Sequence, residues 1–382
     1  MKKYFKEFDY PLFITYFLLS VFGLVMIYSA GMMSAVNRNQ GEPELFYKKQ
    51  LLNVSIGLIF FAVGVTIPYK KYAKKRAMQL LIGSTAVLLI AVHFIGVSPG
   101  NSGAQSWLDL WKVRFQPSEY AKLTTIICLS VFLANLDKRG TIDSIKSYKP
   151  FIFLFAALIF SLYLEPDMGA ILLFGTIVLI IILSSNISMK TISKGLILLT
   201  PFIIIGVIVA ISKGLLTEKR LGRLSAFTNP FEDAENFGLQ IINGYYAIGL
   251  GGVQGAGLGQ SVMKLGYIPE PHTDFILAII SEELGAVGVL IVLGGLGFIV
   301  LRAFVIGIRS RDPLARLMAI GIGSWIGVQT FVNIGGLSGL IPLTGVTLPF
   351  ISYGGTSLVF LSFAMGLLIN ISMFVKKERK TI

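Results

Sequence analysis

The sequence predicts an all-α membrane protein that crosses the bilayer many times. Of its 382 residues, 54% are hydrophobic and only 14% are charged, and the mean hydropathy is +0.76. A soluble domain carries about 25% charged residues, so roughly half of the usual charge is missing. This composition, with a single cysteine, excludes a disordered protein, a disulfide scaffold and an ordinary cytosolic enzyme.

Long apolar runs predict the individual helices. A helix needs about 20 apolar residues to cross a bilayer, and we find ten transmembrane candidates in the sequence. They cover residues 11–29, 50–68, 77–96, 117–135, 149–164, 168–184, 192–211, 274–301, 314–334 and 354–375. The eighth run is the longest, which predicts a tilted span or a span that extends past the membrane.

Basic residues assign the two sides of the membrane. If the N-terminus is cytoplasmic, roughly two thirds of the 33 Lys and Arg residues lie in cytoplasmic segments. The positive-inside rule then places both termini in the cytoplasm and requires an even number of spans. The formal charge of +13 therefore reflects topology and attraction to anionic lipids, and we expect no nucleic-acid partner.

We expect residues 1–382 to form a single membrane domain, because no soluble segment or repeat interrupts the apolar runs. The one long connection, about residues 212–273, lies on the extracellular side between the seventh and eighth spans. Such connections are usually functional or disordered. This connection is rich in aromatic residues and contains seven glycines from Gly244 to Gly259 inclusive. That composition disfavours disorder.

Charged side chains inside or beside a span are costly, so each is a candidate for function. Pro117 begins the fourth span, and Glu119 and Lys122 share one helical face about a turn inside the membrane. This pair fits a functional role and a purely structural, self-neutralising role equally well. Lys112 and Arg114, just outside the span, are cations suited to phosphate.

Two weaker candidates lie in the connections. Asp167 follows Glu165 and Pro166 in a turn between the fifth and sixth spans. Turn geometry explains this sequence better than chemistry, although Asp167 at a helix start could organise a site. In the long loop, Arg223 is a candidate to bind an anionic group, and the alternative is a solvated surface charge.

The sharpest candidate precedes the eighth span. Glu270, His272 and Asp274 lie within five residues, and Thr273 can cap the helix that begins near Asp274. Dipole matching is the structural alternative for an Asp at a helix start, but the three titratable groups together favour acid–base chemistry. Glu282 would lie about 12 Å deeper along the helix and could organise the site. With only two histidines in the chain, a histidine-built metal site is disfavoured.

An uncharged stretch rich in hydroxyl groups, residues 339–357, connects the last two spans. Irregular backbone at membrane depth is tolerated where it is buried or lines a cavity. Ser352, Tyr353 and Ser357 could therefore offer hydroxyl groups to a ligand. Equally, the stretch could be a re-entrant packing element.

These residues lie in stretches that strongly resemble the SEDS family (shape, elongation, division and sporulation) of the FtsW and RodA type. The stretches are FQPSEYAK (115–122), EPDMGA (165–170), AIGLGGVQGAGLG (247–259), IPEPHTDFILAIISEELG (268–285) and LIPLTGVTLPFISYGGTSL (340–358). The resemblance covers essentially the whole chain. TLPFISYGG and YIPEPHTDF are more similar to the cell-division type than to the elongation type.

The resemblance implies a peptidoglycan glycosyltransferase that polymerises lipid II at the outer face of the cytoplasmic membrane. It also implies a class B penicillin-binding protein, a transpeptidase, and other division proteins as partners, at the division septum. Asp274 takes the place of the family's essential aspartate, and we expect it to be the general base that deprotonates the acceptor 4-hydroxyl. Cations would stabilise the departing diphosphate, and a divalent cation such as Mg or Mn stays open. The expected substrate-binding residues are Glu119, Lys122, Lys112, Arg114, Arg223, Glu270, His272, Thr273, Ser352, Tyr353 and Ser357.

Two other functions are compatible with the same charges. A transporter for a lipid-linked saccharide needs access from both sides and often contains inverted repeats. The charged groups concentrate near the outer face and no persuasive repeat is present, which favours an enzyme. A noncatalytic scaffold for the transpeptidase would leave the acidic residues before the eighth span without a purpose.

Overall fold

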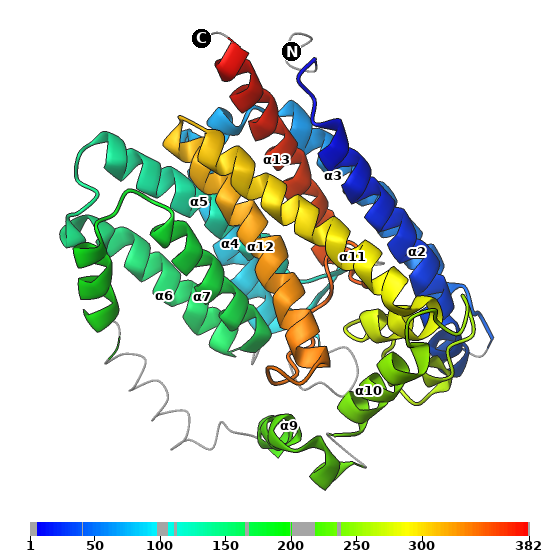
Figure 1. The fold of residues 1–382 in the computed structure, drawn as a ribbon. Coiled ribbons are helices and arrows are strands. Elements are labelled where there is room, and N and C mark those ends of the chain that lie inside the picture. Colours follow the sequence, from blue (N-terminus) through cyan, green and yellow to red (C-terminus); the bar gives the residue numbers. More distant parts are fainter. Residues whose placement is uncertain are drawn as a thin grey trace.

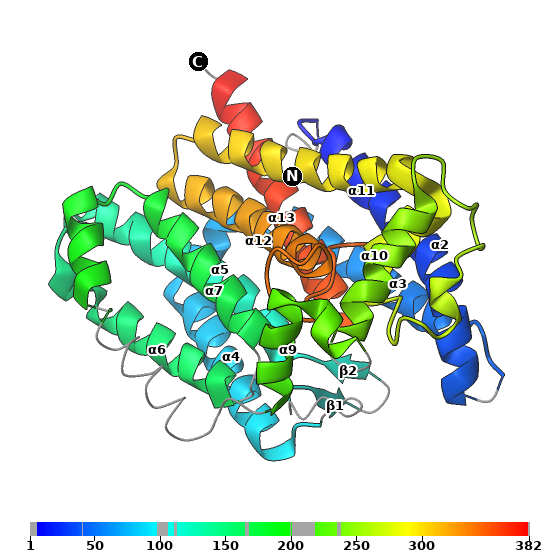
Figure 2. The same cartoon turned by 60° about the horizontal axis from the view of Figure 1, so that its bottom comes forward.

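The computed structural model describes residues 6–39, 41–97, 106–110, 113–164, 168–198, 200, 218–234 and 238–380. Within these residues the chain forms a bundle of long helices with one small two-stranded sheet (Figures 1 and 2). Seven of the described helices are long and apolar enough to cross a membrane. The prediction of a helical membrane protein is therefore confirmed, with the small sheet as a departure from a purely α-helical chain, and the chain is a multi-pass membrane protein.

The long helices follow the predicted apolar runs. They are α2 (Tyr10–Asn39), α3 (Leu45–Thr66), α4 (Lys75–Ile95), α5 (Pro117–Lys138), α11 (Ile276–Arg309), α12 (Pro313–Leu337) and α13 (Gly355–Lys380). Two shorter helices, α6 (Lys149–Leu164) and α7 (Met168–Leu183), match the fifth and sixth runs. The seventh run, residues 192–211, lies largely outside the described residues, so the number of ten spans stays a prediction.

The connections contain short elements. Within the described part of the long loop predicted at 212–273 there are two α-helices, and the extracellular position of the loop stays a prediction. Its elements are α9 (Glu218–Thr228), η3 (Pro230–Asp233), α10 (Leu239–Gly251) and η4 (Met263–Leu265). The others are η1 (Tyr69–Ala73), β1 (Leu108–Leu110), β2 (Val113–Phe115) and η2 (Ile145–Tyr148).

Helices α5, α12 and α13 form the centre of the bundle. In the most apolar 18-residue stretch of each of these helices, 72–83% of the residues are buried. In α4, at the periphery, the share is 17%. Glycine allows α3 and α13 to approach closely, because a Cβ at Gly64 would lie only 2.6 Å from the carbonyl oxygen of Phe363. Residues of the centre can therefore be held rigidly in place.

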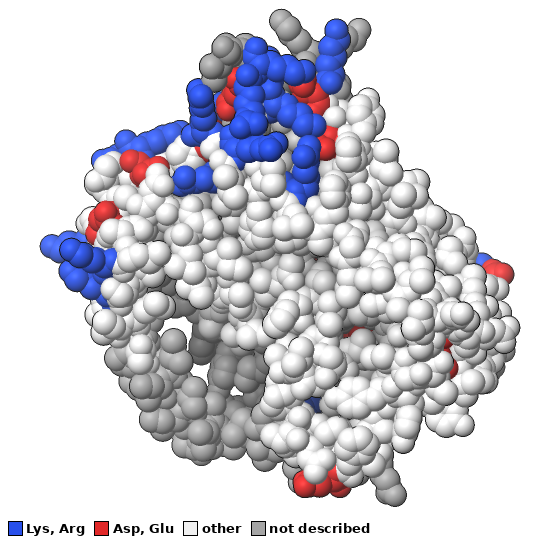
Figure 3. All heavy atoms as spheres, viewed as in Figure 1, with Lys and Arg blue, Asp and Glu red and all other residues white. Residues whose placement is uncertain are grey.

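The two chain ends lie at the same end of the bundle (Figure 1). There the buried Asp9 carboxylate accepts a hydrogen bond from Ser372 at 2.8 Å and pairs with Arg302 at 3.0 Å and Lys376 at 3.2 Å. Lys and Arg side chains gather over this end of the molecule (Figure 3). This uneven distribution of basic side chains corresponds to the excess of Lys and Arg in the segments that the sequence predicts to be cytoplasmic.

Helix α11, the eighth predicted span, is broken near its start. Gly285 has φ 61° and ψ −158°, a conformation essentially restricted to glycine. Residues 276–284 therefore form a short half-helix before the long remainder of α11. The break accounts for the unusual length of the eighth apolar run.

Candidate active site

Asp274 lies two residues before α11, and this helix begins at the end of the bundle opposite to the chain ends (Figure 1). The N-cap of α11 is Phe275 and no side chain caps it, so the predicted cap by Thr273 is wrong. The Asp274 side chain is partly buried. The Thr273 hydroxyl lies 3.0 Å from Asp274 Oδ1 and 2.8 Å from the carbonyl oxygen of Glu270. Because a hydroxyl has one proton, it can donate to only one of these acceptors at a time. The structure thus brings Glu270, Thr273 and Asp274 together in one turn, residues 270–274, which we call the Asp274 turn.

The surroundings of Asp274 alter its acidity. Burial raises the pKa of Asp274 to about 6, while the Thr273 hydrogen bond and the positive charge of Arg223 lower it and the Glu270 charge raises it. Arg223, exposed on α9, is therefore close enough to act electrostatically on Asp274. A carboxylate with a pKa near 6 is mostly deprotonated at neutral pH and still accepts a proton effectively.

Asn333 on α12 holds the backbone at this position. Its Nδ2 donates hydrogen bonds to the carbonyl oxygens of Asp274 and Val346, both at 2.8 Å. Val346 belongs to the α12–α13 loop, residues 338–354. In the same loop, a Cβ at Gly345 would lie 4.0 Å from Asp274 Oδ2, so the loop forms a wall beside the carboxylate.

Asn333 is one of three polar residues at four-residue spacing on α12, which we call the α12 polar row (Trp325, Gln329 and Asn333). The Gln329 side chain accepts a hydrogen bond from Trp325 Nε1 at 2.8 Å and donates to the carbonyl oxygen of Thr347 at 3.0 Å. At this spacing the three side chains share one helical face. Gln329 and Asn333 therefore anchor the α12–α13 loop at Thr347 and Val346 over about 6 Å of helix, and Trp325 holds Gln329 in place.

The predicted Glu119–Lys122 pair forms at the start of α5. Lys122 Nζ lies 2.8 Å from Glu119 Oε1, with 2% and 9% of the side chains exposed. The same ammonium lies 5.3 Å from the centre of the Trp325 ring. Since Trp325 begins the α12 polar row, the row connects this buried pair to the backbone of Asp274.

Arg114 and His272 have different surroundings. Arg114 is exposed on β2 and faces Asp109 on β1, with 3.8 Å between Nε and Oδ1. Burial raises the pKa of Tyr353, and the positive charge of Arg114 partly offsets this effect.

His272 is buried, with its ring 3.9 Å from that of Phe46 and 5.5 Å from that of Tyr353 (centre to centre). Within the Asp274 turn, His272 thus packs in an aromatic cluster.

The two serines of the uncharged stretch take part in internal packing. Ser352 accepts a hydrogen bond from the backbone N–H of Leu348 at 2.8 Å, and Ser357 lies 3.5 Å from Gln329 Nε2. Both side chains are buried. In this structure both serines therefore pack internally, and their contact with a ligand stays a prediction.

Comparison with known proteins decides the family. The model for the FtsW/RodA/SpoVE family, described as "Cell cycle protein", matches residues 10–377. The chain belongs to the FtsW/RodA/SpoVE family. This confirms the resemblance that the sequence motifs indicate.

Relatives of this family member span nearly its full length. It is 42% identical to "Probable peptidoglycan glycosyltransferase FtsW" of Bacillus subtilis (strain 168), over 98% of this chain and 93% of the relative. It is 35% identical to "Stage V sporulation protein E" of the same organism, over 96% and 97% of the two chains.

Solved structures of the FtsW/RodA/SpoVE type have the same fold. One chain, from "Structural coordination of polymerization and crosslinking by a peptidoglycan synthase complex", has a TM-score of 0.75 at 24% identity and covers 96% of this chain and 98% of its own. The Thermus thermophilus rod shape determining protein RodA has a TM-score of 0.67 at 23% identity, with 96% of each chain covered. These likenesses support the helical membrane fold.

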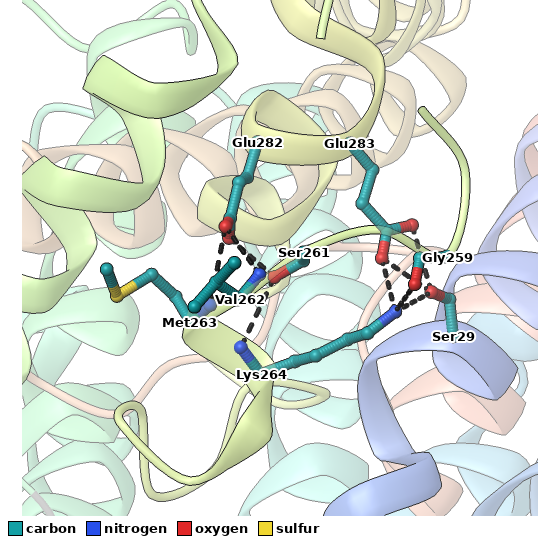
Figure 4. A network of polar contacts seen from close by, with 8 residues as sticks. All are labelled: Ser29, Gly259, Ser261, Val262, Met263, Lys264, Glu282 and Glu283. Atoms are coloured by element: carbon teal, nitrogen blue, oxygen red, sulfur yellow. Dashed lines mark hydrogen bonds and ion pairs between the residues drawn. The ribbon is translucent and has the colours of Figure 1, made fainter. Parts of the chain in front are cut away.

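In this family member, some predicted residues do not join the Asp274 turn. Lys112 and Asp167 lie outside the described residues. Glu282 binds the backbone of residues 262 and 263, one half-helix away from Asp274 (Figure 4). Among the described residues, no three His, Cys, Asp or Glu side chains form a group that could hold a metal ion.

Sequence reasoning missed four residues that organise this end of the molecule. They are Gln329 and Asn333 on α12, and Ser29 and Lys264, which contact Glu283. The four-residue spacing of polar side chains in an apolar span would have indicated the first two. Ser29 and Lys264 are separated in sequence from each other and from Glu283, so no local pattern indicates their contact.

Proposed function

We propose that this chain is a peptidoglycan glycosyltransferase that polymerises lipid II, with Asp274 as the general base. The observation that carries the proposal is the setting of Asp274: a partly buried carboxylate with a pKa of about 6, on a backbone fixed by Asn333. The name of the Bacillus subtilis relative, at 42% identity over nearly the whole chain, supports the reaction.

The proposed reaction is a single displacement. The Asp274 carboxylate takes the proton from the 4-hydroxyl of the acceptor sugar, and the oxygen forms a bond to the anomeric carbon of the donor. The bond from that carbon to the lipid diphosphate breaks, and the diphosphate leaves with the electron pair. An α-linked donor and a β-linked product require one inversion, hence one base and no nucleophilic carboxylate.

Cations near the site would stabilise the departing diphosphate. Arg114 and Arg223 are exposed and can reach a substrate, whereas Lys122 is buried and would act as a fixed positive charge beside Glu119. Lys112 belongs to the same proposal. A divalent cation such as Mg or Mn, bound with the diphosphate, would supply further charge neutralisation.

The remaining predicted contacts surround the base. Thr273 would orient the carboxylate through its hydroxyl, and Glu270 would hold the pKa up by its charge. His272, Tyr353, Ser352 and Ser357 would contribute by shaping the wall next to the substrate, and Asp167 by organising a nearby helix start.

We also propose the topology and the assembly. Residues 1–382 form one domain with ten spans, both termini are cytoplasmic, and the long loop near 212–273 is extracellular, so Asp274 faces the outside. The bias of basic residues toward the chain ends supports this orientation (Figure 3). A class B penicillin-binding transpeptidase and other division proteins are the proposed partners at the septum. The fold similarity to a chain of a peptidoglycan synthase complex is compatible with such an assembly.

The decisive experiment is glycan polymerisation from purified lipid II by the reconstituted protein, with and without its transpeptidase partner. Polymer from the wild type and none from folded Asp274→Asn is the expected result. If Asp274→Asn polymerises at the wild-type rate, the base assignment is wrong. If neither protein polymerises with partner and divalent cations present, lipid flipping is the next activity to measure.

A further inference from the structure

A buried ion pair joins the long loop to the half-helix of α11. Lys264 Nζ lies 2.7 Å from Glu283 Oε1, and only 6% and 0% of the two side chains are exposed. Lys264 also donates to Ser29 on α2 at 2.9 Å and to the carbonyl oxygen of Gly259 at 2.8 Å. We call these four residues the Lys264 network (Figure 4). An ammonium group has three donors, and all three are used here.

The neighbouring carboxylate binds the same segment from the other side. Glu282 accepts hydrogen bonds from the Ser261 hydroxyl and from the backbone N–H groups of Val262 and Met263, the latter two at 2.7 and 3.3 Å. In Figure 4 the two glutamates extend from α11 next to each other, Glu282 toward Ser261 and Val262, and Glu283 toward the Lys264 ammonium and Ser29. Each of the two carboxylates therefore has its own set of donors.

The glycine-rich backbone completes the attachment. Around the break at Gly285, the carbonyl oxygens of Glu282 and Glu283 accept hydrogen bonds from the N–H groups of Ala256 at 2.8 Å and Gly257 at 2.9 Å. A Cβ at Gly255 would collide with the carbonyl of Glu283, which explains the need for glycine. Residues 251–264 are thus fixed to residues 281–286 by both backbone and side chains.

This arrangement closes a loop around the candidate base. The chain leaves the Lys264 network, passes through Asp274, enters the half-helix and returns to Glu283 in the same network. Glu283 lies seven residues after Ile276, the first residue of α11, or about 10 Å along the helix, so it does not touch the reacting groups. The Asp274 turn is held at both of its ends.

We infer that Lys264 and Glu283 are positioning residues for the transferase reaction: their ion pair closes the 264–283 segment and so fixes the Asp274 carboxylate. This inference rests on the proposed function. A displacement of about 1 Å in a catalytic group can lower a rate about a hundredfold. The pair therefore acts on the rate of the chemical step and leaves substrate binding to other residues.

A stabilising role alone makes a different prediction. Replacing a buried ion pair by apolar residues of similar size is often neutral or stabilising, because the desolvation of both charges is avoided. Replacing the ion pair by apolar residues therefore distinguishes an effect on the position of the 264–283 segment from an effect on the stability of the protein. The variant Ser29→Ala/Lys264→Met/Glu283→Leu removes all the polar side chains of the network together and leaves no buried charge unpaired.

The test is lipid II polymerisation by this triple variant, with kcat, KM and the melting temperature measured on each protein. We expect kcat to fall about tenfold to a hundredfold, KM to stay within about twofold and the melting temperature not to fall. The matched control is Glu44→Leu/Lys48→Met, which removes an exposed ion pair of 3.1 Å on α3 and should leave kcat unchanged. Wild-type kcat in the triple variant overturns the inference.

Two further measurements keep the test decisive. If the triple variant does not fold, Glu283→Asp keeps the charge and shortens the side chain by one methylene, and an unchanged kcat again overturns the inference. Hydrogen exchange of the amides at 265–274 needs no activity and should be faster in either variant than in the control. The wild type and Asp274→Asn are measured in the same assay. If the wild type polymerises lipid II and Asp274→Asn does not, a wild-type kcat in the triple variant contradicts this inference and leaves the proposed function intact.

Discussion

Asn333 donates hydrogen bonds from one nitrogen to the backbone carbonyls of Asp274 and Val346, both at 2.8 Å. The helix that carries Asn333 also carries Trp325, over which the Lys122 ammonium lies. A single face of α12 thus sets the distance between the candidate base, the loop beside it and the buried cation. This role explains the amide side chains of Gln329 and Asn333 in an otherwise apolar span.

Asn333→Leu should weaken both the fold and the reaction. Leucine has a similar size but no donor, so two carbonyl oxygens lose their partner, at a cost of about 1–3 kcal/mol for each buried group. We expect a lower melting temperature and at least a tenfold lower polymerisation rate. Thr330→Val on the same helix is the control, because the Thr330 hydroxyl bonds only to Ile326 within α12. Equal rates for the two variants would contradict the role of Asn333.

The rate should fall at acidic pH because the base must be deprotonated. With a pKa of about 6 for Asp274, kcat/KM is expected to drop below about pH 6. Arg223 lowers this pKa, so Arg223→Ala should move the midpoint to higher pH. Arg114→Ala should leave the midpoint in place. A pH profile of polymerisation for the three proteins measures the effect, and coincident midpoints would disprove the coupling.

The same pKa makes a prediction about stability. The folded state favours protonated Asp274, with a pKa of about 6 against an ordinary value of 3.8, so deprotonation destabilises the fold as pH rises through this window. Asp274→Asn stays neutral and should melt at a higher temperature than the wild type above pH 6. The difference should vanish near pH 4. Thermal unfolding at both pH values measures it, and a lower melting temperature of the variant at neutral pH would contradict the assignment.

The Glu119–Lys122 pair can be separated into structural and functional parts. Lys122→Met alone leaves a buried carboxylate unpaired and should cost about 3–5 kcal/mol. The double variant Glu119→Gln/Lys122→Met should recover most of that stability. If the Lys122 charge assists the leaving diphosphate, the double variant stays at least tenfold less active. Recovery of both stability and rate would assign the pair a structural role.

Local signals predicted a large part of this molecule. Apolar runs locate the long helices, although α2 and α11 continue well past the predicted ends at residues 29 and 301. The helix start at Pro117 agrees with the prediction because proline has a fixed role there. The Asp274 turn was found because its polar residues are contiguous in sequence. Contacts between distant segments were not accessible in this way. Ser29 and Lys264 meet only because α2 and the long loop pack on the same half-helix.

Sequence periodicity does not predict the break in α11 either. Gly285 is one of several glycines in this helix, and its left-handed φ follows from the loop that docks against it. The apolar pattern continues through the break, because residues 276–280 are apolar and buried on all sides and the remainder of α11 is apolar as well. The long run was therefore interpreted as a tilted or extended span.

Gly285→Ala should disrupt this end of the molecule, whereas Gly294→Ala on the same helix should be tolerated. At Gly285 the positive φ costs about 1–3 kcal/mol for an L residue, and the new Cβ would collide with the backbone of Val253 and Gly255. At Gly294 nothing lies within 4 Å of the added Cβ, and alanine should be neutral or stabilise the helix by about 0.5–1 kcal/mol. Because the collision separates the glycine-rich loop from α11, it should also release the Asp274 turn. Melting temperature and polymerisation rate, measured on both variants, should therefore fall together for Gly285→Ala. Gly294→Ala should keep the wild-type rate and melt at the wild-type temperature or slightly above it. A fully active Gly285→Ala would show that the docked loop does not control the position of the base.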